Sequence, residues 1–170
     1  AVSLTSAGLT VRLQLEDPIR GRVLGQFSAS GSRDSLPALA EELALGVLRL
    51  EAARGDPAVV TTLPRSLPAL RALTTGMAQY RLARYPAAGE SFRRASSING
   101  GTFESMRGGV TSAAAAGRLA EETHWLRQRA SASPPDAPAL TALSYALALT
   151  GDMKGAVDTA LEATTIAPDS

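Results

Sequence analysis

The sequence predicts a mainly helical chain in which a β-hairpin and one helix precede three helix–turn–helix units of equal length. Hydrophobic residues make up 45% of the 170 residues, but aromatic residues only 4%, so the apolar side chains are mostly small. Small side chains favour close helix packing and leave little bulk for a core between two sheets. The other two supporting observations are a period of two near the N-terminus and a period of 34 in the second part of the chain.

The hairpin is predicted from Leu9–Glu16, where apolar and polar residues alternate. This period is typical of a strand with one buried face. Asp17-Pro18 and Gly21 supply turn residues, so Arg22–Ser30 can return as a second strand. Two strands alone are marginally stable in water, so they need a cover or further strands, and we expect the following helix to be the cover.

The pentapeptide SLPAL occurs at Ser35 and again at Ser66. A serine that caps free amides, followed by proline in the first turn, is typical of a helix start. The first copy opens a predicted helix from Ser35 to Arg54, which Ser35 or Asp34 can cap and Gly55 ends. The segment 56–64 is expected to be an extended linker, so we divide the chain into parts 1–64 and 65–170.

The second part contains three predicted units, residues 69–102, 103–136 and 137–170. The first and third align without gaps, and small or apolar residues match at Ala72/Leu140, Ala78/Ala146, Tyr85/Met153, Ala88/Ala156, Ala95/Ala163 and Ile98/Ile166. The middle unit matches less well because Glu122 and Arg129 stand where its neighbours have Ala. A period of 34 is typical of helix–turn–helix repeats.

These units resemble the tetratricopeptide repeat family. The matching residues are Gly76, Tyr85, Ala88, Phe92 and Ala95 in the first unit, and Gly151, Ala156, Ala163 and Pro168 in the third. The first unit departs from the family at Ala83 and Gly100, where Gly and Pro are usual. The resemblance implies a right-handed solenoid that binds proteins or peptides in a concave groove. Carried over by position, the groove residues are Leu73, Met77, Tyr80, Arg81, Arg84, Arg107, Arg118 and Tyr145.

The first part resembles the closing portion of a TolB-like amino-terminal domain, through a strand ending in Asp17, the turn at Gly21, the strand RVLGQF and the helix SLPALAEELALGVL. In bacteria such domains often precede tetratricopeptide repeats in multidomain signalling proteins, which include serine/threonine kinases, nucleotide cyclases and transcriptional regulators. The resemblance implies that residues 1–64 are the incomplete end of an α/β domain and that the chain is an excerpt of a longer protein. It leaves the compartment open, including a membrane tether outside this chain.

The sequence contains no catalytic pattern. It has no Cys, which excludes disulfides and thiolate chemistry, and His124 is its only His. The segment SINGGTFESMRGG lacks the Lys-Ser/Thr and the preceding strand of a phosphate-binding loop. We expect Gly100-Gly101 to form a turn, and Gly108-Gly109 either to permit a close helix contact or to weaken the middle unit. No enzyme activity, cofactor or metal is expected.

The charge distribution favours a protein or peptide partner. The net charge is +1, but residues 65–94 carry six Arg against one acid, between two mildly acidic segments. A nucleic-acid binder would show a more uniform basic face, and no apolar run is long enough to span a membrane. Because Arg pairs with carboxylates through two hydrogen bonds, the groove suits an acidic peptide.

The predicted function is therefore that of a non-catalytic interaction module, an expectation that leaves three alternatives open. The first is a regulatory domain that senses a small ligand between the β part and the first unit and switches an attached kinase or cyclase. The second is an enzyme whose pocket lies around His124. The third is a structural spacer without a ligand. The sequence does not indicate an oligomeric state.

Overall fold

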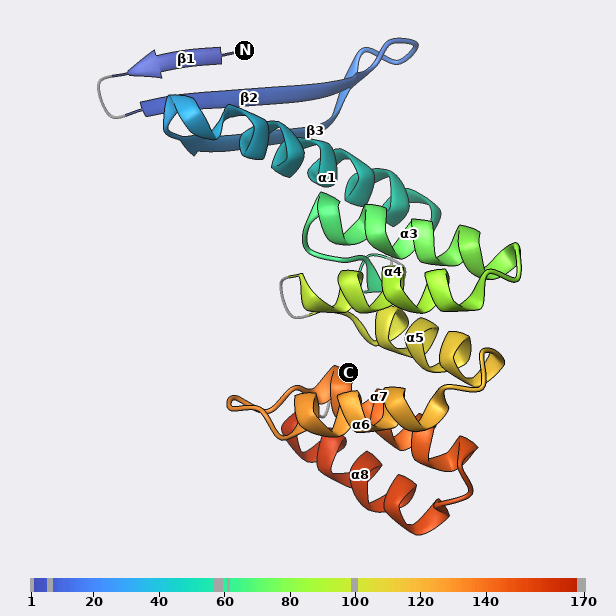
Figure 1. Cartoon of the computed structure of the whole chain (residues 1–170). Helices are drawn as coiled ribbons and strands as arrows, with labels where there is room; N and C mark the ends of the chain where they lie inside the picture. Colours follow the sequence, from blue (N-terminus) through green and yellow to red (C-terminus); the bar gives the residue numbers. More distant parts are fainter. Residues whose placement is uncertain (1, 6–7, 57–59, 61, 99–100, 168–170) are drawn as a thin grey trace. The chain divides into compact units, whose positions relative to one another are not determined.

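The computed structural model describes residues 2–5, 8–56, 60, 62–98 and 101–167. The chain divides into two compact units, Ala1–Leu67 and Pro68–Ser170, and each is described by itself. Among the described residues there are seven α-helices and one antiparallel sheet, so the protein is mainly helical, as predicted (Figure 1).

The first unit contains strands β1 (Val2–Thr5), β2 (Gly8–Asp17) and β3 (Arg22–Gly31), which pair in this order. The predicted hairpin of β2 and β3 is confirmed, and β1 adds a third strand to it. In the turn, Oδ1 of Asp17 accepts the amides of Ile19 and Arg20 at 3.0 and 3.1 Å. Gly21 has a φ of +60°, a conformation that glycine adopts without steric cost.

Helix α1 (Leu36–Gly55) follows a short 3-10 turn, Arg33–Ser35, and lies along the sheet (Figure 1). Leu39 and Leu43 of α1 and Ala29 of β3 are buried in one cluster, against which Phe27 packs. A Cβ at Gly46 would lie 2.7 Å from the Phe27 ring, so a glycine there lets the helix approach the sheet. The predicted cover of the hairpin is thereby confirmed.

Two details of this segment differ from the prediction. The Ser35 side chain does not cap α1, because its hydroxyl donates to the carbonyl of Ser32 at 2.7 Å instead. The proline in the first turn and the end at Gly55 are as predicted. Of the expected extended linker, residues 57–59 and 61 lie outside the described residues, while Val60 and Thr62 are helical.

The second unit is built from consecutive helices: α3 (Leu67–Arg81), α4 (Tyr85–Ser97), α5 (Phe103–Ala115), α6 (Leu119–Ala130), α7 (Ala137–Leu149) and α8 (Met153–Ile166). The starts of α4, α6 and α8 recur with the period of the predicted units, as do the starts of α5 and α7 (Figure 1). Of the predicted Gly100-Gly101 turn only Gly101 is described, with a φ of +70°. Gly100 and Pro168 lie outside the described residues.

The turns α3–α4, α5–α6 and α7–α8 share one backbone conformation. Ala83, Gly117 and Gly151 have φ values of 56°, 70° and 85°, and they recur with the same period as the helix starts. In each turn the next amide donates to the carbonyl five residues earlier, at 3.0, 2.7 and 3.0 Å respectively. This is a Schellman motif, which usually places glycine at the left-handed position. Ala83 holds that conformation without being a glycine.

Phe92 of α4 determines how closely three helices pack. A Cβ at Gly76 of α3 would lie 2.8 Å from the Phe92 ring, and one at Gly108 of α5 would lie 2.7 Å from it. Around it, Ala72, Leu73, Ala88 and Ala95 form a buried cluster. Of the two readings of Gly108, the structure therefore shows a close helix contact. A second cluster joins α5, α6, α7 and α8 around Met106, Val110 and Leu126.

We predict that Ala83→Gly raises the free energy of unfolding by about 0.5–1 kcal/mol. A left-handed conformation costs a non-glycine residue about 1–2 kcal/mol, and the greater chain entropy of glycine offsets part of that gain. Urea unfolding of both proteins measures the difference. Ala78→Gly, an exposed position inside α3, is the matched control and should lower stability by about 1 kcal/mol. A loss of stability in both variants would contradict the argument.

We also predict that Gly108→Ala lowers the free energy of unfolding by about 1–2 kcal/mol, because the new methyl group overlaps the Phe92 ring. Gly89→Ala is the matched control, since its nearest neighbour, the Cβ of Ser112, would lie 3.8 Å away. That variant should gain up to about 1 kcal/mol from helix propensity. If thermal and urea unfolding give the two variants equal stability, Phe92 does not set the helix spacing.

Candidate functional site

Seven of the eight residues predicted to form a groove are exposed. The side chains of Met77, Tyr80 and Tyr145 are 44%, 38% and 36% exposed, and the four arginines are also exposed. Leu73 is only 8% exposed and belongs to the cluster around Phe92, so it is a core residue rather than a contact residue. Helix α3 ends at Arg81, so Arg84 lies in the following turn instead of continuing the helical face of Tyr80.

The turn between α3 and α4 brings together part of the predicted set. The rings of Tyr80 and Tyr85 meet edge to face, with centroids 5.3 Å apart and planes at 62°. Leu82 at the tip is 63% exposed. We call the exposed side chains of Met77, Tyr80, Arg81, Leu82 and Arg84 the α3–α4 surface. It combines apolar and aromatic area with two guanidinium groups.

The other predicted groove residues lie on other elements and have their own contacts. Arg107 of α5 lies over the ring of Phe103, with Cζ 5.9 Å from the centroid. Arg118 precedes α6 and is paired with Glu121 at 2.6 Å. This hydrogen bond raises the pKa of Arg118 and lowers the pKa of Glu121. Arg118, predicted as a groove residue, therefore already has an anionic partner within the chain.

A pocket that sequence analysis did not predict lies between α4, α5 and α6. Residues of all three helices and of the α5–α6 turn line it: Tyr85, Pro86, Gly89, Glu90, Arg93, Ser112, Ala113, Ala116, Arg118 and Glu122. Glu122 is 1% exposed, and Ser112 is fully buried. The buried carboxylate occupies the position at which α4 and α8 carry Ala88 and Ala156.

The Glu122 carboxylate is bonded on one side only. Nε and Nη2 of Arg93 both contact Oε2, at 2.7 and 2.6 Å. Oε1 of Glu122 and Oγ of Ser112 are buried without a hydrogen-bond partner. A Cβ at Gly109 would lie 2.6 Å from Oε1, so the second glycine of the pair makes room for the carboxylate. Burial raises the pKa of Glu122, and the bond to Arg93 opposes that rise.

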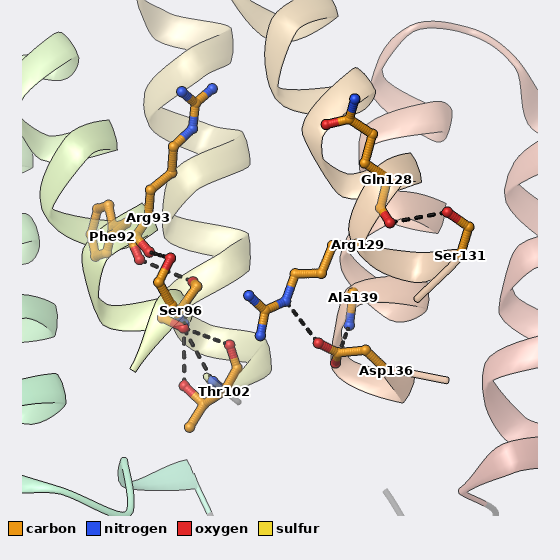
Figure 2. A network of polar contacts seen from close by, with 11 residues as sticks. Phe92, Arg93, Ser96, Thr102, Gln128, Arg129, Ser131, Asp136 and Ala139 are labelled. Carbon is orange, nitrogen blue, oxygen red and sulfur yellow. Dashed lines mark hydrogen bonds and ion pairs between the residues drawn. The ribbon is translucent and has the colours of Figure 1, made fainter. Parts of the chain in front are cut away.

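The arginine that holds Glu122 also contacts the single tryptophan. Arg93 and Arg129 lie over the Trp125 ring, with Cζ 5.9 and 5.6 Å from its centroid. Arg129 donates to Asp136 at 2.7 Å, and Asp136 caps α7 through the amide of Ala139 at 3.1 Å, as Figure 2 shows. These contacts tie α4, α6 and α7 together, and they give Trp125 fluorescence a direct relation to the position of Arg93.

A buried hydroxyl pair closes the other end of the α4–α5 contact. Ser96 and Ser105 share a hydrogen bond of 2.9 Å and are almost fully buried. Thr102 caps α5, with its hydroxyl accepting the Ser105 amide at 3.3 Å (Figure 2). Such satisfied pairs show by contrast that the free acceptors at Glu122 and Ser112 are a local exception.

One feature of the sequence indicates this pocket: two charged residues stand at positions where the other units have small ones. Glu122 and Arg129 break a pattern of small residues, and both carry ionic partners in the structure, Arg93 and Asp136. A charge at a repeated small position indicates a buried pair. The partner of Glu122 could not be identified, because it lies 29 residues away on another helix.

His124 is exposed and shares a hydrogen bond of 3.0 Å with Gln128. Within the described ranges no three acidic, His or Cys side chains gather as a metal site. No helix in the part of the chain that the structure describes is both long and apolar enough to cross a membrane. No family model matches the chain, and no curated protein matches it either.

We predict that Glu122 gives stability a pH dependence that Glu122→Gln removes. The raised pKa means that the folded state holds the proton more tightly than the unfolded state does. The stabilisation of the folded state by this proton is complete below pH 4.5, the ordinary pKa of a glutamate side chain. It is lost as the pH rises through the pKa of Glu122 in the folded state. Urea unfolding of both proteins between about pH 4 and pH 8 gives the difference between their free energies of unfolding. The effects of the carboxylates that both proteins share cancel in this difference, which should fall as the pH rises. A difference that is flat over this range, or rises with pH, would contradict the assignment.

Proposed function

We propose that the second unit is a tetratricopeptide-like, right-handed solenoid that serves as a non-catalytic protein or peptide interaction module of a bacterial signalling or regulatory protein. The regular recurrence of the helix starts, with a period of 34, supports the repeat assignment. So do the three left-handed turn residues, which recur with the same period. The buried pairs Ala88/Ala156 and Ala95/Ala163 stand at equivalent places in α4 and α8. The link to signalling rests on the resemblance of the sequence alone.

The α3–α4 surface is the proposed contact area for a peptide. The observation that carries the proposal is the exposure of Met77, Tyr80 and Leu82 next to two arginines. Among the described residues neither Arg81 nor Arg84 has an ion-pair partner. Aromatic and Arg side chains dominate the binding energy of many interfaces, because they combine large contact area with directed hydrogen bonds. The rigid helix lowers the ordering cost of binding.

The charge of this surface defines the ligand class. The five side chains that define it include two arginines and no acid, so carboxylates in a peptide would be drawn to it. Since Arg81 and Arg84 are exposed, salt screens that attraction, and the apolar contact with Tyr80 would supply the salt-independent part. The proposed ligand is therefore an acidic segment that also carries an apolar or aromatic residue.

We predict that the double variant Arg81→Glu/Arg84→Glu binds acidic peptides at least about tenfold more weakly, because two attractive charges become repulsive. The measurement is binding to an array of acidic, neutral and basic peptides, followed by titration of the hits by fluorescence anisotropy at two salt concentrations. The matched control, Arg94→Glu/Arg127→Glu, changes two other exposed arginines of the same unit and should retain affinity. Equal losses in both double variants would place the contact elsewhere, and an array without hits would refute the proposal.

A further inference from the structure

We propose that the pocket between α4, α5 and α6 binds a primary ammonium group, with Oε1 of Glu122 and Oγ of Ser112 as its acceptors. Both atoms are buried and have no partner, and both residues line the same pocket. A buried polar atom without a hydrogen bond costs free energy, which a ligand that donates to it recovers. The inference does not rest on the proposed peptide contact at the α3–α4 surface.

The ligand must be a hydrogen-bond donor. Glu122 offers an acceptor at Oε1, since Arg93 directs both of its contacting nitrogens to Oε2. The Ser112 hydroxyl oxygen has lone pairs that can accept a hydrogen bond from such a ligand. An anion such as phosphate would place its oxygens against the free carboxylate oxygen and be repelled. A Ca²⁺ ion takes about six to eight oxygen ligands, many more than the two free atoms provide.

The charges around the pocket favour a single positive charge. Two ion pairs close within the site: Arg93 with Glu122 and Arg118 with Glu121, each at 2.6 Å. Glu90 also lines the pocket and acts on Arg118 electrostatically. Two arginines against three glutamates leave a formal charge of −1, so a monocation neutralises the site. An ammonium group supplies three donors with that charge.

The walls suit a slim alkyl stem. Pro86, Gly89, Ala113 and Ala116, which line the pocket with Glu122, have small and largely apolar side chains or none. Only a glycine at position 109 leaves room for the Glu122 carboxylate, because a Cβ there would lie 2.6 Å from Oε1. The chemistry is that of an alkylammonium, which a free small amine and a lysine side chain of a partner protein share.

The experiment titrates the 170-residue chain with n-butylammonium chloride at constant ionic strength and about pH 8, where an alkylamine is protonated. Trp125 fluorescence and the melting temperature are the readouts, since Arg93 contacts both Trp125 and Glu122. Tetramethylammonium chloride is the control ligand, because it has the same charge and no N–H donor. Saturable binding of n-butylammonium alone supports the proposal. An equal response to both salts, or no saturable response to n-butylammonium, overturns it.

Two variants test the acceptors. Glu122→Gln should weaken n-butylammonium binding at least tenfold, and Ser112→Ala several-fold while it leaves the pair with Arg93 intact. Glu162→Gln, an exposed glutamate of α8, is the matched control and should bind like the wild type. Far-UV circular dichroism establishes that each variant is folded. If Glu122→Gln does not fold, the n-butylammonium affinity of Ser112→Ala is the test. Wild-type affinity in folded Ser112→Ala overturns the proposal.

The two sources of the amine are distinguished by a short lysine peptide and the same peptide with acetyl-lysine. Tighter binding of the lysine peptide than of n-butylammonium, abolished by acetylation, indicates a protein partner. Equal affinity indicates a free amine, and binding of the acetylated peptide contradicts the ammonium assignment. The double variant Arg81→Glu/Arg84→Glu should bind n-butylammonium normally, so failure of the peptide contact and failure of the amine site are separable.

Discussion

The contact of the Phe92 ring with two glycines is the constraint on which the rest of the helical unit depends. The ring fits between α3 and α5 only because Gly76 and Gly108 lack a Cβ. Interiors are packed as densely as organic crystals, so one methyl group at either place would move a helix. The close approach of α4 and α5 also has a consequence for charge. Arg93, the next residue after Phe92, reaches from α4 to Glu122 of α6.

Glu122 shows what this packing permits at one position. A buried carboxylate loses its hydration, and its ion pair with Arg93 regains only part of that loss, as the raised pKa of the group indicates. Ala88 and Ala156 fill the equivalent places in α4 and α8 with no such cost. The charged residue therefore does not serve stability better than the alanine would. What it adds is a buried acceptor without a partner on a residue that lines a pocket, which an alanine cannot provide.

Much of the fold could be predicted because it follows from local signals. Alternation over Leu9–Glu16 and the Asp17 turn indicated the hairpin, and glycine and proline marked the helix ends. The failures depend on three-dimensional context. Ser35 bonds a carbonyl instead of capping, Leu73 turns into the core, and α3 ends before Arg84. For the site, a charge at an alanine position marked Glu122. Its partner 29 residues away and the vacant acceptor of Ser112 appear only when the helices are packed.

The two proposed sites differ in the dielectric around their charges, and this difference separates their roles. Arg81 and Arg84 stand in water, where salt screens their charges, so the affinity of the α3–α4 surface for an acidic ligand depends on ionic strength. Glu122 lies where water is excluded, and there a mismatched group leaves a buried charge unpaired. Discrimination between chemical groups therefore belongs to the pocket, and attraction of acidic partners belongs to the α3–α4 surface. Arg118 lines the pocket, but its pairing with Glu121 keeps its charge from opposing a cation there.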